Sequence, residues 1–213
     1  KQAYEAGMRI AYLQCDGFGN ESNEHRKISN LFDVKLRAIT NLAAAGIDIV
    51  PVVTIINTIN NDQVGPIIDF AIQNSDKITF IAFQPVSFTG RDENISDEDR
   101  FEQRYTLSHL AHDIKKQTGI SEPLRDWFPF SAMGPLSDLA DMMQEPGGEW
   151  GTMKCGCHPN CGGGIGLLVN KETKKWKPIT EFFDLERFLE DVQKINDVSR
   201  DSKLTKAQVA LSI

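Results

Sequence analysis

The chain has 213 residues, 40% of them hydrophobic and 25% charged, which predicts a globular protein with a core and excludes a disordered or fibrous one. Its formal net charge of -7 at pH 7 argues against a nucleic-acid-binding surface, because such a surface gathers lysine and arginine to neutralise phosphates. No run of about 18 apolar residues is present and the first residues lack the pattern of a signal peptide, so we expect a cytoplasmic protein that does not span a membrane.

The beginning of the chain indicates a fragment of a longer protein. Residues 1–7 resemble the last turns of a helix that enters a strand, and residue 1 is lysine and not methionine. Residues 9–17 are predicted to form a short strand that ends in a polar turn. A helix is predicted over residues 28–45 because apolar residues recur at helical spacing, and Gly46 is expected to end it.

The next part of the chain alternates between strand and helix. Residues 47–56 form a nearly continuous β-branched run, typical of a strand buried on both faces of a parallel sheet. Asn60 and Asn61 are expected to open a helix, and residues 78–83 to form a third buried strand. Strand and helix in this order predict βαβ units, which fit both a doubly wound sheet and a β/α barrel. Residues 61–65 lack the glycine pattern of a phosphate-binding loop, so helix capping is the role expected of them.

Beyond residue 118 the alternation fades, which indicates two parts of the chain. We expect residues 1–144 to be the α/β part and residues 145–213 to be a smaller part that begins with a segment rich in glycine and cysteine. The residues from 197 onward are polar and are expected to be loose. The further elements predicted are a long helix, a short helix, a two-stranded hairpin and a closing helix, over residues 97–118, 136–143, 167–170 with 176–179, and 184–195.

Polar side chains lie where the predicted strands end. Gln14 and Asp16 end the first strand, Thr54 lies near the end of the second, and Gln84 and Arg91 follow the third. Ligands of parallel α/β folds bind at the carboxyl ends of the strands, so these residues are candidates for a binding site. The alternative for Asp16 is that it only caps the turn that follows it, and the sequence alone leaves both interpretations open.

Three of the four cysteines, Cys155, Cys157 and Cys161, fall within seven residues of one another. Thiolates at this spacing, in a segment made pliable by neighbouring glycines, can converge on one centre, and glycine amides can donate to cluster sulfurs. The segment fits an iron–sulfur cluster or zinc, although the second half of a usual zinc site is missing, and unligated thiols are the third alternative. Cys15 is expected to be buried beside its strand without a role as a ligand.

Six segments of the chain together carry a resemblance to a known family. They are LQCDG at 13–17, LFDVKLRAI at 31–39, AGIDIVPVVT at 45–54, NDQVGPIIDFA at 61–71, FQPVSFTGR at 83–91 and CHPNC at 157–161. They resemble the second half of a radical S-adenosyl-L-methionine (radical SAM) barrel, and the likeness covers roughly residues 1–170. Within that superfamily the chain is similar to the group that contains the archaeal tetraether lipid synthase and its relatives, some of them named pterin methyltransferases.

The resemblance implies an α/β fold, namely the second half of a partial (β/α)6 radical SAM TIM-like barrel. A small Cys-rich auxiliary-cluster segment with a hairpin and a C-terminal helix would follow it. It also implies two cofactors, S-adenosyl-L-methionine and a 4Fe-4S cluster that cleaves it reductively, giving a 5′-deoxyadenosyl radical that takes hydrogen from carbon. The cofactor-binding residues expected by position are Gln14, Asp16, Thr54, Gln84, Pro85 and Arg91. The metal ligands expected are Cys155, Cys157 and Cys161.

The chain departs from the superfamily in one respect. The defining C-x3-C-x2-C loop is absent from the 213 residues, so we expect the chain alone to be inactive and to need the missing N-terminal half of the barrel as a partner. The resemblance favours lipid chains as the substrate, a small molecule being the alternative, with carbon–carbon bond formation or methyl transfer as the reaction. An electron donor protein is also implied. The competing interpretation is a non-catalytic zinc- or iron-binding α/β module.

Overall fold

The computed structural model describes residues 1–17, 19, 30–89, 94–143, 162–202 and 208. Its helices and strands are α1 (Gln2–Glu5), β1 (Ile10–Gln14), α2 (Leu31–Ala44), β2 (Asp48–Ile55), η2 (Asn61–Gln63), α3 (Val64–Gln73), β3 (Ala82–Pro85), α4 (Asp97–Gln103), α5 (Leu107–Thr118), β4 (Phe128–Pro129), η4 (Phe130–Met133), α6 (Gly134–Met143), β5 (Gly163–Gly164), β6 (Leu167–Val169), β7 (Trp176–Pro178), η7 (Ile179–Glu181) and α7 (Leu185–Ser202).

The chain divides into two compact units. The first comprises Lys1–Ile120 with Val169–Trp176, and the second comprises Ser121–Leu168 with Lys177–Ile213. The boundary expected at residue 144 lies outside the described residues and stays a prediction. None of the helices in the described ranges is long and apolar enough to cross a bilayer.

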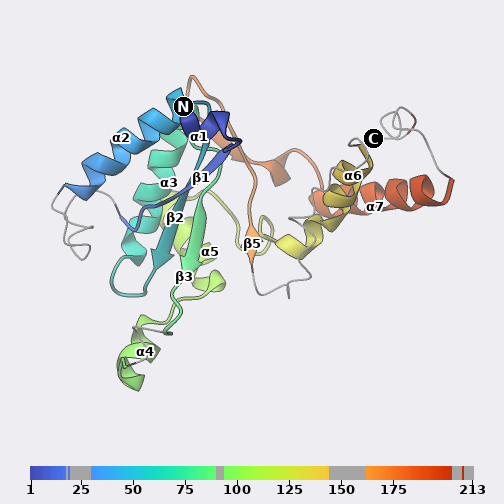
Figure 1. The fold of residues 1–213 in the computed structure, drawn as a ribbon. Coiled ribbons are helices and arrows are strands. Elements are labelled where there is room, and N and C mark those ends of the chain that lie inside the picture. The colour runs from blue at the N-terminus through green and yellow to red at the C-terminus, as the bar shows by residue number, and fades with distance from the viewer. Residues whose placement is uncertain (18, 20–29, 90–93, 144–161, 203–207, 209–213) are drawn as a thin grey trace. The chain divides into compact units, whose positions relative to one another are not determined.

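A three-stranded parallel sheet in the order β1-β2-β3 organises the first unit (Figure 1). Gln14 at the end of β1 is in register with Val52, and Thr54 near the end of β2 is in register with Gln84. Parallel strands joined by helices confirm the predicted α/β class with its βαβ units. The barrel itself stays a prediction.

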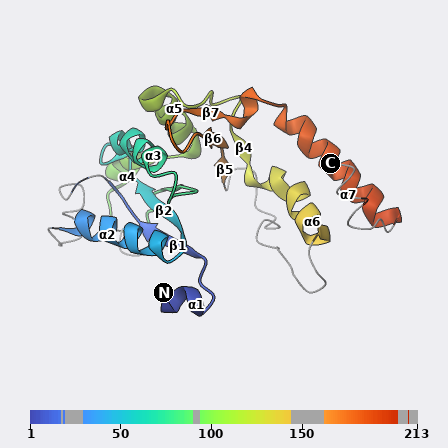
Figure 2. The ribbon, with the colours of Figure 1, turned by 90° about the horizontal axis from the view of Figure 1, so that it is seen from above.

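The two faces of this sheet differ. On one face Ile49 packs with Ile39 of α2 and Ala71 of α3, all of them buried, so these helices cover that face. The other face carries Ile10 and Tyr12 of β1, which are 51% and 70% exposed. Figure 2 shows α5 beside α3, to which it is joined by a hydrogen bond from the Gly65 amide to a side chain of α5. The sheet is therefore covered by α2 and α3 on one side and open along β1 on the other.

Two elements of the first unit differ from their predicted ranges. The third strand begins at Ala82 and not at Ile78, because Ile78 makes only an isolated bridge to Ile49 while its side chain is buried in the core. Burial without continuous pairing produces the same apolar pattern as a strand. The helix expected over 97–118 is two helices, since α4 ends at Gln103 and the Thr106 side chain accepts the His109 amide as the N-cap of α5.

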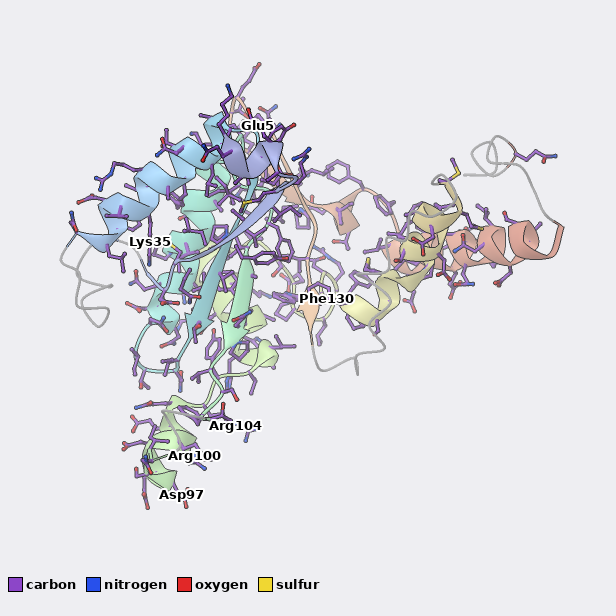
Figure 3. The ribbon with its side chains drawn as sticks, viewed as in Figure 1. Glu5, Lys35, Asp97, Arg100, Arg104 and Phe130 are labelled. Atoms are coloured by element: carbon purple, nitrogen blue, oxygen red, sulfur yellow. The ribbon has the colours of Figure 1, made fainter. Side chains whose placement is uncertain are left out.

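The second unit pairs β4 with β5 in an antiparallel ladder and packs α6 against α7. An ideal Cβ on Gly162 would lie 2.6 Å from a ring carbon of Phe130, so this aromatic ring rests directly on the glycine backbone (Figure 3). The Phe130 amide also donates to the Gly162 carbonyl at 3.1 Å. The hairpin of β6 and β7 is confirmed, while the closing helix α7 runs past residue 195, where we expected it to end, to Ser202.

Candidate functional site

Three of the predicted site residues share one face of the sheet at the carboxyl ends of its strands. Gln14, Thr54 and Gln84 come from β1, β2 and β3 in turn, and the register places them on the face opposite α2 and α3. Pro85 is in register with Ile55 and so belongs to the helix side of the sheet. Alternation along the strands therefore separates Pro85 from the other three.

Asp16 connects the first two of these strands. The Gln14 Nε2 donates to Asp16 Oδ1 and, at 3.3 Å, to Thr54 Oγ1. The Thr54 amide donates to the same Asp16 oxygen at 3.1 Å. Because Asp16 is 5% exposed and its partners include a residue 38 positions away, its contacts extend beyond the local turn. The structure thus brings together Gln14, Asp16 and Thr54.

Hydrogen-bonding groups at this site are available to a ligand. Among the residues that the structure describes, no group donates to Gln14 Oε1, the Thr54 hydroxyl donates to no acceptor, and the Gln84 carboxamide makes no hydrogen bond. Gln14 and Thr54 are half-buried and Gln84 is exposed. The site can therefore offer acceptors and donors to a small polar ligand without breaking its internal bonds.

A buried thiol and a buried cation lie beneath this network. Cys15 is 3% exposed, as predicted, and burial raises the pKa of its thiol, an effect that Lys35 opposes and Asp16 reinforces. Lys35 comes from α2, where Figure 3 labels it, and is 7% exposed. We did not predict it, although a lysine four residues from Leu31 and four from Ile39 lies on the apolar stripe of that helix. Lys35 thus adds positive charge near the Cys15 thiol.

Asn60 is the second site residue that the sequence did not indicate, since it was expected only to open a helix. Its Nδ2 donates to the backbone carbonyl of Asp16 at 3.0 Å and to that of Thr54 at 2.9 Å. The side chain thereby joins the segments that follow β1 and β2. A helix-opening asparagine carries no sequence signal for such a contact, because the contact depends on the path of the loop before it.

The backbone at the start of α3 is engaged within the fold. The Gly65 amide donates to Gln117 Oε1 at 2.8 Å, and Gln117 Nε2 donates to the Asn61 carbonyl at 2.8 Å. A side chain of α5 thus caps this helix, in place of the local cap that the sequence suggested. The amide is not available to an anionic ligand.

The remaining predicted site residues lie outside the described residues. They are Arg91, Cys155, Cys157 and Cys161. Within the described ranges, no group of three or more histidine, cysteine or acidic side chains is arranged to hold a metal ion. The metal ligands therefore stay a prediction from the sequence.

Comparison with known proteins finds a curated relative of this chain by sequence. The chain is 33% identical over 211 residues to a 7,8-dihydro-6-hydroxymethylpterin dimethyltransferase of Methanocaldococcus jannaschii. The chain resembles a pterin methyltransferase along nearly its whole length. The match takes in 98% of the chain but only 40% of the relative. No family model matches the chain.

Proposed function

We propose that the chain is part of a radical SAM methyltransferase and that Gln14, Asp16, Thr54 and Gln84 bind S-adenosyl-L-methionine. The observation that carries the proposal is the network of Gln14, Asp16 and Thr54 at the carboxyl ends of parallel strands, on the face that the helices leave open. Ligands of such folds bind at this edge. The resemblance to radical SAM barrels and the methyltransferase name of the relative support the same assignment.

The proposed substrate is a small heterocycle such as a reduced pterin. The name of the relative specifies a hydroxymethylpterin and a methyl transfer, and it lends no support to lipid chains or to carbon–carbon bond formation, which the resemblance had also suggested. A half-buried site with free amide and hydroxyl groups suits a polar ligand better than an alkyl chain. Substrate and cofactor would both meet the open face of the sheet.

The residues of this site fit S-adenosyl-L-methionine in their chemistry. Gln14 Oε1, which accepts from none of the described residues, can accept from an amine, and the Thr54 hydroxyl can donate to a carboxylate or to a ring nitrogen. When bound beside a 4Fe-4S cluster, this cofactor would supply a 5′-deoxyadenosyl radical. What the chain's own residues do is bind and orient: Asp16 holds the Gln14 side chain and the Thr54 backbone in place.

We propose that the cluster-binding loop and the remaining strands come from an N-terminal half of the barrel. The chain covers 40% of the relative's length and holds no C-x3-C-x2-C motif. The outer edge of β1 has no strand partner among the described residues, and Tyr12 beside it is 70% exposed. An unpaired edge with exposed apolar side chains is suited to accept another strand. Cys155, Cys157 and Cys161 would hold an auxiliary cluster, and an electron donor protein would reduce the enzyme.

Binding of S-adenosyl-L-methionine tests the proposal directly. Gln14→Ala removes the donor to both Asp16 and Thr54 together with the acceptor Oε1, and we expect it to weaken binding by tenfold or more in equilibrium dialysis of the full-length protein with its cluster reconstituted. Gln73→Ala, at an exposed position at the end of α3, is the matched control and should bind like the unaltered chain. Equal affinity of the two variants, or no binding by the unaltered full-length protein, would contradict the assignment.

Metal analysis distinguishes the proposed enzyme from the competing function, a non-catalytic metal-binding module. Anaerobic reconstitution with iron and sulfide should give a brown protein that holds iron if the cysteines bind a cluster. A colourless protein with stoichiometric zinc would favour the module.

A further inference from the structure

The loop between β2 and η2 holds itself in one conformation through side chains. The Ile56 amide donates to Asn60 Oδ1 at 2.8 Å, and the Thr58 amide donates to Asn61 Oδ1 at 2.9 Å. Thr58 has a φ of +65°, in the left-handed region that a β-branched residue rarely adopts. Such a conformation persists only where the surroundings determine it, and loops of this kind gather at functional sites.

Asn60 uses both ends of its carboxamide. Oδ1 closes the loop on Ile56, while Nδ2 donates to the carbonyls of Asp16 and Thr54 at 3.0 and 2.9 Å. Both of these carbonyls belong to residues that the proposed function assigns to the cofactor. One side chain therefore bridges the residues that end β1 and β2, which also form the side-chain network above.

The same loop is tied to α4. The Asn57 amide donates to the Gln103 carbonyl at 3.1 Å, and Asn57 Nδ2 donates to the Glu102 carbonyl at 2.8 Å. Figure 1 shows α4 beyond the carboxyl ends of β2 and β3. The loop thus links the ends of β1 and β2 to α4, and Asn60 is the loop residue that contacts both strand ends.

We propose that Asn60 is a positioning residue of the cofactor site: it keeps Asp16 and Thr54 in the arrangement that binds S-adenosyl-L-methionine. The inference rests on the proposed function. Asn60 does not contact the cofactor in this proposal, since the oxygen and the nitrogen of its carboxamide are both hydrogen-bonded within the protein. Its effect is to arrange the binding groups before the ligand arrives, which reduces the cost of ordering them on binding.

The decisive variant is Asn60→Asp, which keeps the acceptor for Ile56 but replaces the shared donor with an oxygen that repels the two carbonyls. We expect the dissociation constant for S-adenosyl-L-methionine to rise at least tenfold. In the ligand-free protein, hydrogen exchange of the Thr54 amide should become at least tenfold faster. Asn60→Ser, which adds no charge and can still donate to one carbonyl, should show a smaller change in the same direction and serves if the aspartate variant does not fold.

Asn74→Asp is the matched control. Its Nδ2 also donates to a backbone carbonyl, that of Phe70 at 2.9 Å, at the end of α3 and away from the carboxyl ends of the strands. A merely structural role for Asn60 would lower the unfolding midpoint by as much as this control does and leave the affinity of the folded protein unchanged. That result would overturn the inference while leaving the proposed function in place. Failure of the unaltered full-length protein to bind the cofactor would overturn both.

Discussion

Asp126 is a carboxylate with 2% of its surface exposed, in the second unit. Burial alone would raise its pKa, but hydrogen bonds from the Arg125 guanidinium, the Thr180 hydroxyl and the Glu122 amide outweigh burial and lower the pKa to about 2. Since the pKa is lower in the folded state than the ordinary value near 3.8, the ionised form stabilises the fold. This stabilisation is complete above about pH 4 and is lost as the pH falls toward 2.

Replacing this carboxylate should therefore make the free energy of unfolding depend less on pH in the acid range. We expect Asp126→Asn to lower the free energy of unfolding of the second unit by about 2 kcal/mol at pH 7, and the difference to shrink toward zero between pH 4 and pH 2. Urea unfolding followed by tryptophan fluorescence measures it, since Trp127 lies in the same unit. A difference that stays constant down to pH 2 would show that ionisation of Asp126 does not stabilise the fold.

At the level of single residues, the sequence indicated the part of the site that follows from strand periodicity. The proximity of Gln14, Asp16 and Thr54 could be predicted because polar residues that end buried parallel strands meet at one edge of the sheet. The role of Asn60 could not be predicted, because its hydrogen bonds to residues at two strand ends depend on a left-handed residue in the preceding loop. Lys35 could have been predicted from its place on an apolar helical stripe.

Helix α3 packs closely on α5 at a glycine. A Cβ on Gly65 would lie 3.0 Å from the Cβ of Gln117, an atom attached to the helix backbone that cannot swing away. Gly65→Ala should therefore push the helices apart and lower the free energy of unfolding by about 1 to 3 kcal/mol, despite the better helix propensity of alanine. Urea unfolding followed by circular dichroism measures the loss.

Gly134, the first residue of α6, provides the comparison for this substitution. A Cβ there meets nothing within 4 Å, so Gly134→Ala should change the stability by less than about 0.5 kcal/mol. If both alanine variants were equally stable, close packing between α3 and α5 would not be the reason for glycine at position 65.

At the level of elements, the order of strands and helices could be predicted and some boundaries could not. Alternating apolar runs predicted the three parallel strands and their helices, which the sheet order confirms. The start of β3 was wrong because Ile78 is buried without being part of the ladder. The break between α4 and α5 was missed although Thr106 is a favoured N-cap residue, because the apolar pattern continues across it.

For the whole molecule, the outer edge of β1, which pairs with no strand in the part of the chain that the structure describes, should have a measurable effect. Exposed strand edges with apolar side chains recruit other chains, so we expect the 213-residue chain to self-associate as its concentration rises in sedimentation velocity experiments. Tyr12→Lys places a charge beside this edge and should shift the chain toward the monomer.

Phe101→Lys is the control for this experiment, because Phe101 is 83% exposed but lies on α4 and away from the edge. It should leave self-association unchanged. A monomer at every concentration, or the same shift from both lysine variants, would show that the β1 edge does not drive association.

The contact between Phe130 and Gly162 has a consequence for the cysteines that precede it. Because β4 pairs with β5 and the ring covers the glycine, the chain on the downstream side of Cys161 is already joined to residues 128–130, which precede α6. The residues on either side of the segment from 131 to 161 are thus held together within the folded unit, so the entropy of bringing them together has already been lost. If Cys155, Cys157 and Cys161 bind a cluster as we propose, it should bind more tightly than it binds a free peptide of the same sequence, and chelating its iron should leave the second unit folded.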